Sequence, residues 1–331
     1  MIKRTLHFSN PAYLNLNQDQ LQIDLPHLKS LGEKESKKSV PIEDIGIVIL
    51  DHQQITITHG CIAALLANNA AIITCNHNHL PTGMMLPIDG HDIQSERFRY
   101  QIDASQPLKK QLWQQTVQAK ILNQAAVLFD RGLPCDNMVY WARSVRSGDP
   151  DNYEARAAAY YWKNVFPKKV DFFRGRDGDP PNNLLNYGYA ILRAIVARGL
   201  VSSGLLPTLG IHHRNKYNAY CLADDIMEPY RPYVDLIVLR IIDSGENFLE
   251  LGISIKSQLL GIATVDVQFE KGTSPLMVGL QTTTSSLAKC YEGVIRKINY
   301  PLMKTFEHKR MSNAIALPNE VIGLENEEAT E

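Results

Sequence analysis

The sequence lacks the patterns that mark several large classes of protein. Its 331 residues contain no run of roughly 18 consecutive apolar residues, so we expect no membrane-spanning helix. The first residues lack the apolar core and the small-residue cleavage site of a signal peptide, which predicts a cytoplasmic protein. Five cysteines are scattered along the chain without a CxxC pair, which argues against a disulfide framework and a thiolate zinc site.

Several motifs of nucleotide and hydrolase chemistry are also missing. The sequence contains no GxxxxGK[ST], GxGxxG, GxSxG or HExxH. P-loop nucleotide hydrolysis, dinucleotide redox chemistry and acyl-serine chemistry therefore have no support. An HNH triplet at residues 77–79 lacks the flanking pattern of a ββα-metal nuclease and is interpreted as a turn.

The net charge is close to zero, at −1, but the charges are unevenly distributed. Residues 1–90 hold 6 Lys and Arg against 8 Asp and Glu, and residues 312–331 hold 5 acidic residues and no basic one. The segment 91–311 therefore carries 28 basic and 22 acidic residues, a net charge of +6. A basic body of this kind favours a polyanionic partner.

Hydrophobic patterning divides the chain into two parts. The first ninety residues hold short segments rich in Ile, Val, Leu and Thr, which predict strands at 2–8, 12–17, 20–25, 40–51, 54–59 and 71–75. A helix is expected at 60–69, and the lysine-rich segment 27–39 is expected to be an exposed hairpin tip.

Beyond residue 90 the apolar residues recur three and four apart, which predicts helices at 92–104, 108–129, 152–166, 183–200 and 287–299. The predicted fold class is a two-domain α+β protein, with a small N-terminal β-rich domain at 1–90 and a larger all-α catalytic domain at 91–311. Residues 312–331 are expected to form an acidic, flexible tail.

The first candidate for chemistry is Glu154. Asp149 followed by Pro150 predicts the start of its helix, and the many alanines around it indicate close helix packing. A carboxylate in such a place is protonated, paired or bound to a cation. The alternatives to a metal ligand are an ion pair with Arg156 or Arg193 and a solvated helix face.

The second candidate is the segment 207–235. Asp225 and Glu228 lie three residues apart and share one face if they begin a helix, and His213 comes from the preceding loop. One imidazole and two carboxylates suit a hard divalent ion, Mg²⁺ or Mn²⁺. In the alternative interpretation the acids cap a helix and pair with Arg231, and His212 and His213 are turn residues.

The third candidate is the segment 162–179, where basic residues alternate with phenylalanines in an irregular, Gly- and Pro-containing stretch. This pattern is typical of a loop that contacts phosphates, although a solvated loop is equally ordinary. The basic residues are Lys163, Lys168, Lys169, Arg174 and Arg176.

Together these motifs resemble the CRISPR-associated integrase family, the catalytic subunit that inserts new spacers into CRISPR arrays. The resemblance runs from about residue 1 to residue 305. Residues 40–87 are similar to the family's β-domain, and DNYEARAAAYYW is similar to the helix with its metal-binding glutamate. Residues 182–213 lead into its histidine, and DDIMEPYRPYVD is similar to its last acidic motif.

The resemblance implies roles for single residues. Glu154, His213 and Glu228 match the metal-binding and catalytic positions, and a glutamate at the last position resembles the type II branch. Asp225 matches a supporting acid, and Arg231 matches a basic position near phosphate. Asn186 and Tyr187 lie in the segment LNYGYA of the resemblance and are expected to line the site. His212 has no fixed counterpart in the family and is expected to support the site or contact DNA.

The resemblance also implies the reaction and its partners. A 3′-hydroxyl of prespacer DNA attacks a phosphodiester at the leader–repeat boundary, while Mg²⁺ or Mn²⁺ polarises the phosphate. The chain forms a homodimer through its β-domain, and two dimers bind a dimer of a small ferredoxin-like companion protein in a heterohexamer. The RNA-guided effector nuclease is a further candidate partner, and no membrane partner is expected.

Two other functions fit the same residues. A stand-alone divalent-metal nuclease acting on branched DNA would use the same site but would not join 3′ ends. A non-catalytic, structural DNA-binding subunit would use its acidic residues only in salt bridges, and it predicts that Glu154→Ala leaves every activity unchanged.

Overall fold

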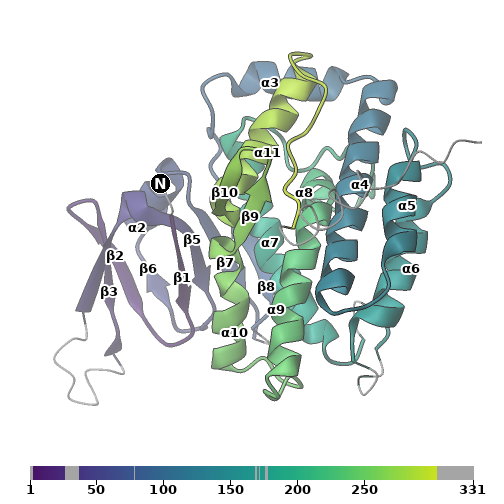
Figure 1. The fold of residues 1–331 in the computed structure, drawn as a ribbon. Coiled ribbons are helices and arrows are strands. Elements are labelled where there is room, and N and C mark those ends of the chain that lie inside the picture. Colours follow the sequence, from purple (N-terminus) through teal and green to yellow (C-terminus); the bar gives the residue numbers. More distant parts are fainter. Residues whose placement is uncertain are drawn as a thin grey trace, which may run out of the picture.

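Strands dominate the first part of the chain and helices dominate the rest (Figure 1). The computed structural model describes residues 3–26, 37–77, 79–167, 170, 172–175 and 178–303. The strands are β1 (Arg4–Phe8), β2 (Tyr13–Asn17), β3 (Gln20–Asp24), β4 (Lys37–Pro41), β5 (Ile45–Leu50), β6 (Thr56–Ile57), β7 (Ala71–Cys75), β8 (Pro81–Met85), β9 (Asp266–Phe269) and β10 (Gly272–Pro275). The α-helices are α2 (His59–Ala67), α3 (Gln94–Asp103), α4 (Gln106–Asp130), α5 (Asp136–Ser144), α6 (Tyr153–Val165), α7 (Asn182–Ser202), α8 (Cys221–Met227), α9 (Arg231–Asp243), α10 (Ile253–Leu260) and α11 (Leu276–Tyr291).

Two four-stranded sheets build the N-terminal part. The first has the order β1-β5-β7-β8, in which β1, β5 and β7 are parallel and β8 runs antiparallel to β7. The second has the order β4-β3-β2-β6, in which β2, β3 and β4 are antiparallel neighbours. The predicted hairpin tip lies mostly in residues 27–36, outside the described residues.

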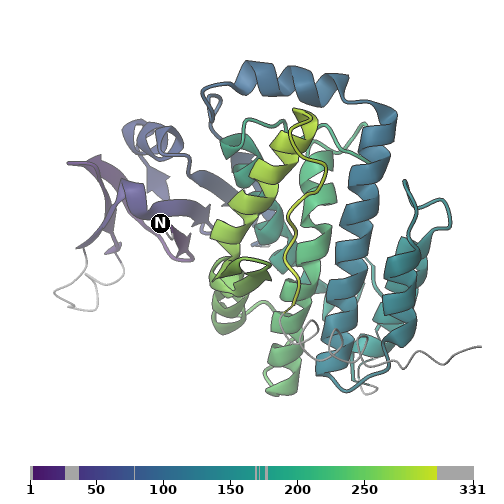
Figure 2. The ribbon, with the colours of Figure 1, turned by 45° about the horizontal axis from the view of Figure 1, so that its top comes forward.

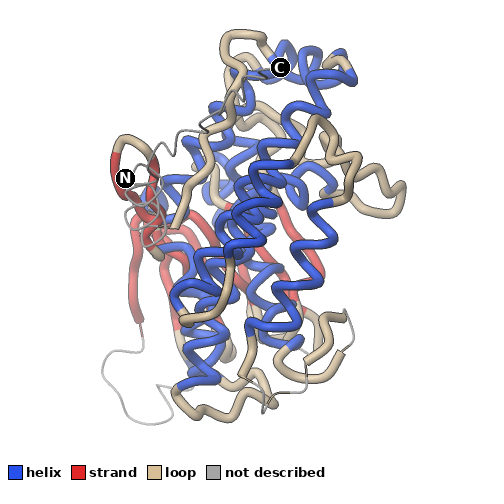
Figure 3. Tube along the Cα trace, turned by 45° about the vertical axis from the view of Figure 1, so that its right-hand side comes forward, coloured by secondary structure: helices blue, strands red, loops and turns tan. Residues whose placement is uncertain are grey.

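Residues of the first sheet enter two different cores. From Ile47 onward β5 alternates between them, as the period of two in a strand requires, and a register shift against β1 between Ile45 and Ile47 puts Ile45 on the face of Val48. Ile45 and Val48 of β5 pack with the second sheet and α2. Ile47 and Ile49, on the opposite face, pack in the core of the helical part, as does Ile73 of β7. Figure 3 shows the sheets along one side of the helices. One face of the first sheet is therefore part of the same core as the helices.

The helical part is organised around α4 and α7. Helix α7 contacts β7 and β8 on one side and α8, α9 and α11 on others. Helix α4 packs against α5, α6 and α9, and Figure 2 shows α3 lying across one end of this body. This arrangement brings α4, α6 and the start of α9 together, and the candidate site lies where they meet.

The predicted fold class is confirmed, with strands first and helices after them. The helical part also contains the β9-β10 hairpin, which the sequence analysis does not predict. The expected helix at 287–299 is wrong in its extent, because α11 ends at Tyr291. Gly293 follows with φ of 75°, and the N–H groups of Gly293 and Val294 bond back to the carbonyls of Cys290 and Lys289. This is a Schellman motif, which ends a helix.

Helix α7 is long and apolar enough to cross a membrane by length and composition alone. In the structure, however, 83% of its apolar window is buried inside the protein. The helix is the central core element of the fold. The division of the chain at residue 90 stays a prediction, as does the tail at 312–331, which lies outside the described residues.

Candidate active site

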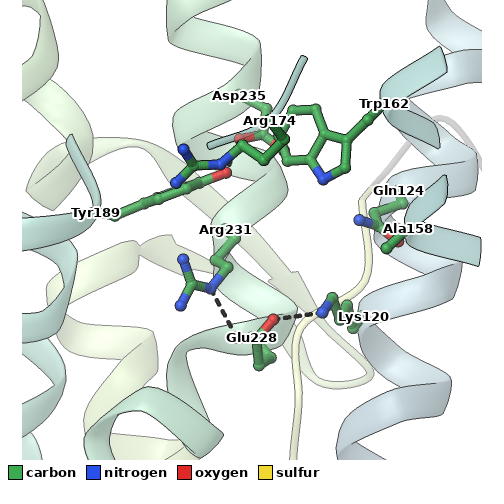
Figure 4. Close-up of a pocket in the computed structure, with 9 residues that line it drawn as sticks. All are labelled: Lys120, Gln124, Ala158, Trp162, Arg174, Tyr189, Glu228, Arg231 and Asp235. Carbon is green, nitrogen blue, oxygen red and sulfur yellow. Dashed lines mark hydrogen bonds and ion pairs between the residues drawn. The ribbon is translucent and has the colours of Figure 1, made fainter. Parts of the chain in front are cut away.

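Two carboxylates from different elements meet at one ammonium group. Glu154 lies in the first turn of α6, and Glu228 begins a short 3₁₀ turn between α8 and α9. The Nζ of Lys120, on α4, lies 2.7 Å from Oε1 of Glu154 and 2.6 Å from Oε2 of Glu228. Arg231 holds the other oxygen of Glu228 at 2.8 Å from its Nε, as Figure 4 shows. The two carboxylates thus converge on a position that a cation occupies.

The charges at this position stabilise one another. Burial alone would raise the pKa of Glu228, but the positive charges of Arg231 and Lys120 outweigh it and lower the pKa to about 2. Burial would lower the pKa of Lys120, but Glu228 and Glu154 raise it above its ordinary value. At neutral pH Glu228 is therefore ionised between two positively charged side chains, Lys120 and Arg231.

A local turn orients Glu154. Helix α6 begins at Tyr153, three residues later than the expected start at Pro150. Asp149 caps it nevertheless, because its two carboxylate oxygens accept hydrogen bonds of 2.9 Å from the N–H groups of Tyr153 and Glu154. Capping a helix this way satisfies N–H groups that have no partner within the helix. The cap fixes the first turn, and with it the direction of the Glu154 side chain.

The loop between α7 and α8 supplies the imidazoles. The Nδ1 of His213 is hydrogen-bonded to the buried carboxylate of Asp225, on α8. This bond raises the pKa of His213 against the opposing effect of burial. His212 stacks on the ring of Trp113 with 4.1 Å between ring centroids, and burial lowers its pKa. No described residue hydrogen-bonds the other ring nitrogen of His213, Nε2, which leaves it for a ligand.

The loop depends on a close approach of its own backbone at Gly210. A Cβ atom at this position would lie 2.8 Å from Oδ2 of Asp225 and even closer to the carbonyl of His213. Real Cβ atoms do not tolerate such contacts, so only glycine fits here. Gly210 therefore allows the carboxylate of Asp225 to reach the imidazole.

The residues fit a divalent cation in their chemistry. Carboxylate oxygens from Glu154 and Glu228 point to one place, and His213 is bonded to Asp225, three residues before Glu228. A hydrogen bond from Nδ1 to a carboxylate is the arrangement that orients metal-binding histidines. Within the described residues no three His, Cys, Asp or Glu side chains are spaced to hold a metal. Between Glu154 and Glu228 lies the ammonium of Lys120 instead.

Of the ion pairs with arginine predicted for Glu154 and Glu228, the described part of the structure contains only the one of Glu228. Glu228 does pair with Arg231, whereas Glu154 pairs with Lys120 and not with the two arginines considered for it. Arg193 instead binds the neighbouring acid Asp224 through two hydrogen bonds of 2.7 and 3.1 Å. The guanidinium of Arg156 lies over the rings of Tyr153 and Trp141.

A cavity of about 130 Å³ opens beside Glu228 (Figure 4). Asp235, at its end away from the carboxylate pair, accepts hydrogen bonds from the hydroxyls of Tyr161 and Tyr189. Burial raises the pKa of Asp235 to about 6, although these bonds oppose the rise. The lining residues are Lys120, Gln124, Ala158, Trp162, Arg174, Tyr189, Glu228, Arg231 and Asp235.

The predicted phosphate-contacting loop is described only in part. Lys163 is exposed on α6, and Lys168, Lys169 and Arg176 lie outside the described residues. Arg174 lies over the ring of Tyr189 and donates hydrogen bonds to Asn182 and Asn186. Of this group, Arg174 is the residue that lines the cavity beside Glu228.

The two residues expected near the site on α7 point to different places. Asn186 accepts a hydrogen bond of 2.9 Å from Arg174, which connects it to the cavity. Tyr187 is fully buried, and its hydroxyl interacts electrostatically with Asp51, just after β5, and with Cys75 of β7. None of the interactions described for Tyr187 reaches Glu154 or Glu228, so the structure does not bring it into the candidate site.

Sequence reasoning missed Lys120 and Trp113. Both lie on the buried face of α4, at the helical spacing that includes Trp113, Val117, Lys120 and Gln124. A lysine on such a face is almost never buried without a carboxylate partner. A lysine at a position where the helical spacing predicts a buried apolar residue is therefore the signal for a carboxylate partner of Lys120.

The comparisons with known proteins now decide the family. The sequence matches the family described as CRISPR associated protein Cas1 over residues 7–248. The chain belongs to the Cas1 family. A CRISPR-associated endonuclease Cas1 from Neisseria meningitidis serogroup C is 38% identical over 288 residues, which cover 86% of this chain and 91% of that relative.

Solved structures of the Cas1 family share the fold. A CAS1 protein from Thermotoga maritima has a TM-score of 0.68 at 15% identity, and the match covers 88% of this chain and 97% of that one. A casposase bound to integration product has a TM-score of 0.76 at 20% identity, over 96% of this chain and 99% of that chain. A chain of a Cas6-RT-Cas1–Cas2 complex has a TM-score of 0.69 at 19% identity, over 92% of this chain and 36% of that chain.

Proposed function

We propose that this chain is a divalent-metal-dependent DNA endonuclease and integrase that inserts prespacer DNA into a CRISPR array. Membership of the Cas1 family and the 38% identity to a CRISPR-associated endonuclease support the proposal. The observation that carries it is the convergence of Glu154 and Glu228 on one cation position, with His213 bonded to Asp225 three residues before Glu228. This is a ligand set of the kind that phosphoryl-transfer sites use.

In this proposal Glu154, His213 and Glu228 hold Mg²⁺ or Mn²⁺. Bound there, the ion supplies Lewis-acid polarisation of the scissile phosphate. Asp225 keeps the imidazole of His213 in position through the bond to Nδ1, and His212 is supported by the ring of Trp113. The guanidinium of Arg231 stays beside Glu228 and offers a fixed positive charge to a phosphate oxygen.

The reaction exchanges one phosphodiester for another. The 3′-hydroxyl oxygen of a prespacer strand bonds to the phosphorus at the array boundary, and the bond from phosphorus to the displaced 3′ oxygen breaks. No covalent intermediate with the protein and no nucleotide hydrolysis are needed, which agrees with the missing P-loop motif. Water in place of the 3′-hydroxyl gives endonuclease activity from the same residues.

DNA contacts come from the basic residues of segment 91–311 in this proposal. Arg231 and Arg174 line the cavity beside Glu228, and Lys163 is exposed on α6. Lys168, Lys169 and Arg176 are proposed for the same role on the sequence pattern alone. Each neutralised phosphate adds to the salt dependence of binding, because it releases counterions.

The proposed partners follow from the relatives. A Cas1–Cas2 complex is among the similar structures, and we propose a Cas2-type companion dimer between two homodimers of this chain, with double-stranded prespacer and leader–repeat DNA. The similar casposase is bound to integration product, which supports DNA as substrate. We place the assembly in the cytoplasm, and the RNA-guided effector nuclease remains a further proposed partner.

An integration assay tests the proposal. The purified protein, with and without its companion, is incubated with a prespacer carrying free 3′-hydroxyls and a supercoiled plasmid bearing a leader and repeat, in Mg²⁺ or Mn²⁺. We expect covalent prespacer–plasmid product that disappears with His213→Ala. His59→Ala is the matched control, because His59 is exposed at the start of α2. Cleavage without joining, even with the companion present, would instead identify a nuclease. Metal-independent DNA binding with neither cleavage nor joining would identify a structural subunit.

A further inference from the structure

A buried lysine holds the place between the two acids. Lys120 is only 9% exposed, and its ammonium contacts the carboxylates of Glu154 and Glu228 at once. With Arg231 on the other oxygen of Glu228, two positive charges balance the two negative ones. The carboxylate pair is therefore neutralised by the chain itself, without any added ion.

The ammonium of Lys120 and a divalent ion compete for the same volume. Mg²⁺ sits about 2.0–2.1 Å from its oxygen ligands. The Nζ of Lys120 is already 2.7 and 2.6 Å from the two oxygens on which such an ion would be bound. A metal ion and an ammonium group cannot share that position, because they would overlap and repel each other. Metal binding must move the ammonium away.

The structure offers the ammonium a second position. Gln124 lies one helical turn after Lys120 on α4, so the two side chains share a face. Its Oε1 is buried and has no hydrogen-bond partner among the described residues, and both side chains line the cavity of about 130 Å³. Figure 4 shows Gln124 and Lys120 on the same side of this cavity. The carboxylate of Asp235 lines it too and opposes the charges of Arg174 and Arg231.

We infer that Lys120 is a positioning residue with two places: it bridges Glu154 and Glu228 until a divalent ion enters, and then turns to the Oε1 of Gln124. The inference rests on the proposed metal site and assigns a role to a residue outside the ligand set. Before metal binding, Lys120 keeps two acids of like charge together. After metal binding, its charge remains beside the site and adds to the attraction for a phosphate.

The inference predicts opposite effects on stability and on metal affinity. Lys120→Met keeps an unbranched side chain that is one atom shorter, and it removes the charge. Without metal, the variant leaves Glu154 unpaired and melts at a lower temperature than the wild type. It also removes the competitor, so Mn²⁺ binds more tightly by about tenfold, the equivalent of about 1.4 kcal/mol. A lysine that only supported packing would lower the melting temperature and would not tighten Mn²⁺ binding.

The second position is tested by Gln124→Leu. Loss of the Oε1 acceptor makes displacement of the ammonium less favourable, so Mn²⁺ binding weakens by about three- to tenfold. The Lys120→Met background has no ammonium for the Oε1 of Gln124 to accept. In that background Gln124→Leu should therefore leave the Mn²⁺ affinity unchanged. This double-mutant cycle isolates the contact between the two side chains. An undiminished effect of Gln124→Leu in that background would overturn the second position.

The experiment is Mn²⁺ titration of the full chain by calorimetry, together with melting curves with and without Mn²⁺. Lys289→Met is the matched control, because Lys289 is exposed on α11, and it should leave Mn²⁺ affinity and melting unchanged. Loss of Mn²⁺ binding in His213→Ala confirms that the titration reports this site. Wild-type protein without a Mn²⁺ site would overturn the proposed function. Wild-type binding with equal or weaker binding by Lys120→Met would overturn the role of Lys120 alone.

Discussion

Asp225 accepts a hydrogen bond from Nδ1 of His213, and its other oxygen accepts the backbone N–H of His212 at 2.9 Å. Asp225 is fully buried, so this carboxylate ties the loop before α8 to the helix itself. An imidazole held at Nδ1 presents Nε2 in a fixed direction. The position of the proposed metal-binding nitrogen is thus set by a residue that need not touch the metal.

Removal of this carboxylate should weaken metal binding without abolishing it. We expect Asp225→Ala to lower Mn²⁺ affinity by about 10–100-fold, the usual cost of losing a partner that orients a metal-binding histidine. Asp225→Asn should lie between this variant and the wild type, because an amide oxygen still accepts from Nδ1. Calorimetric titration with Mn²⁺ measures both effects.

The neighbouring acid provides the control for that experiment. Asp224 is one residue away on α8, and its carboxylate is held by Arg193 and Asn218 instead of an imidazole. Asp224→Asn should therefore leave Mn²⁺ affinity unchanged. If Asp224→Asn and Asp225→Asn lowered the Mn²⁺ affinity equally, an acid on α8 would matter only through its net charge.

Substitution of Gly210 should disturb the same pair from the backbone side. Gly210→Ala places a methyl group against the carboxylate of Asp225 and the carbonyl of His213, so the loop must shift. We expect a lower melting temperature and loss of integration activity. Gly60→Ala is the control, because a Cβ there meets nothing within 4 Å and the residue lies in the first turn of α2, so alanine should not lower the melting temperature.

Asp235 should give the stability of the protein a distinct dependence on pH. Its pKa of about 6 in the folded state exceeds the ordinary value of 3.8, because it is buried. Between these values the folded state binds the proton more strongly than the unfolded state does. The contribution of Asp235 to stability is therefore greatest below the ordinary pKa and falls as pH rises to about 6, by roughly 3 kcal/mol.

Asp235→Asn tests this dependence, since an amide does not titrate. Urea unfolding at pH 4, 5, 6 and 7 should show that the stability of the wild type relative to this variant declines between pH 4 and 6 and is then constant. Glu228 acts in the opposite direction at lower pH, because its pKa is lowered to about 2, but it is present in both proteins. A difference that does not vary with pH would contradict the buried, protonated state of Asp235.

A separate charge cluster joins the first sheet to the helices. Asp51 follows β5 and is buried, and its carboxylate contacts His7 at 3.1 Å, His79 at 2.9 Å and Lys256 of α10 at 2.9 Å. Burial would raise the pKa of Asp51, but these hydrogen bonds lower it well below its ordinary range. Lys256 is the member that comes from the helical part.

Breaking this contact should destabilise the whole chain. We expect Lys256→Met to lower the free energy of unfolding by about 3 kcal/mol, because it leaves a buried carboxylate short of its cation. Asp51→Asn combined with Lys256→Met should recover part of the loss, since the pair is then removed together. Urea denaturation measures both. The contact would not be the cause if the double variant lost more free energy of unfolding than the two single variants lose together.

The sequence predicts the order of strands and helices because hydrophobic periodicity is local. It does not predict how far α11 extends, although Gly293 stands where a glycine ends a helix and could have set that boundary. The hairpin of β9 and β10 escapes prediction for a different reason. Its strands are four residues each, too short for alternation to be distinguished from a turn.

The sequence predicts the two acids and the histidine of the candidate site, but it does not predict the lysine between the acids. Glu154, His213 and Glu228 lie in motifs, whereas the partner of both acids is Lys120, which lies 34 residues before Glu154 on another helix. Such a pairing depends on tertiary packing of α4 against α6 and the start of α9, which no local pattern contains. Tyr187 is the opposite case: its motif predicts a place near the site, but it lies on a face of α7 that is directed toward Asp51.

The shared core between the first sheet and α7 limits how this chain can evolve. Ile47, Ile49 and Ile73 meet side chains of the helical part, so a change of size on one side requires a matching change on the other. Exchange of residues 1–90 with those of a distant relative would mismatch that surface. Chimeras joined at this position should be insoluble unless the facing residues of α7 are exchanged with them, and the two halves of the gene should be inherited as a unit.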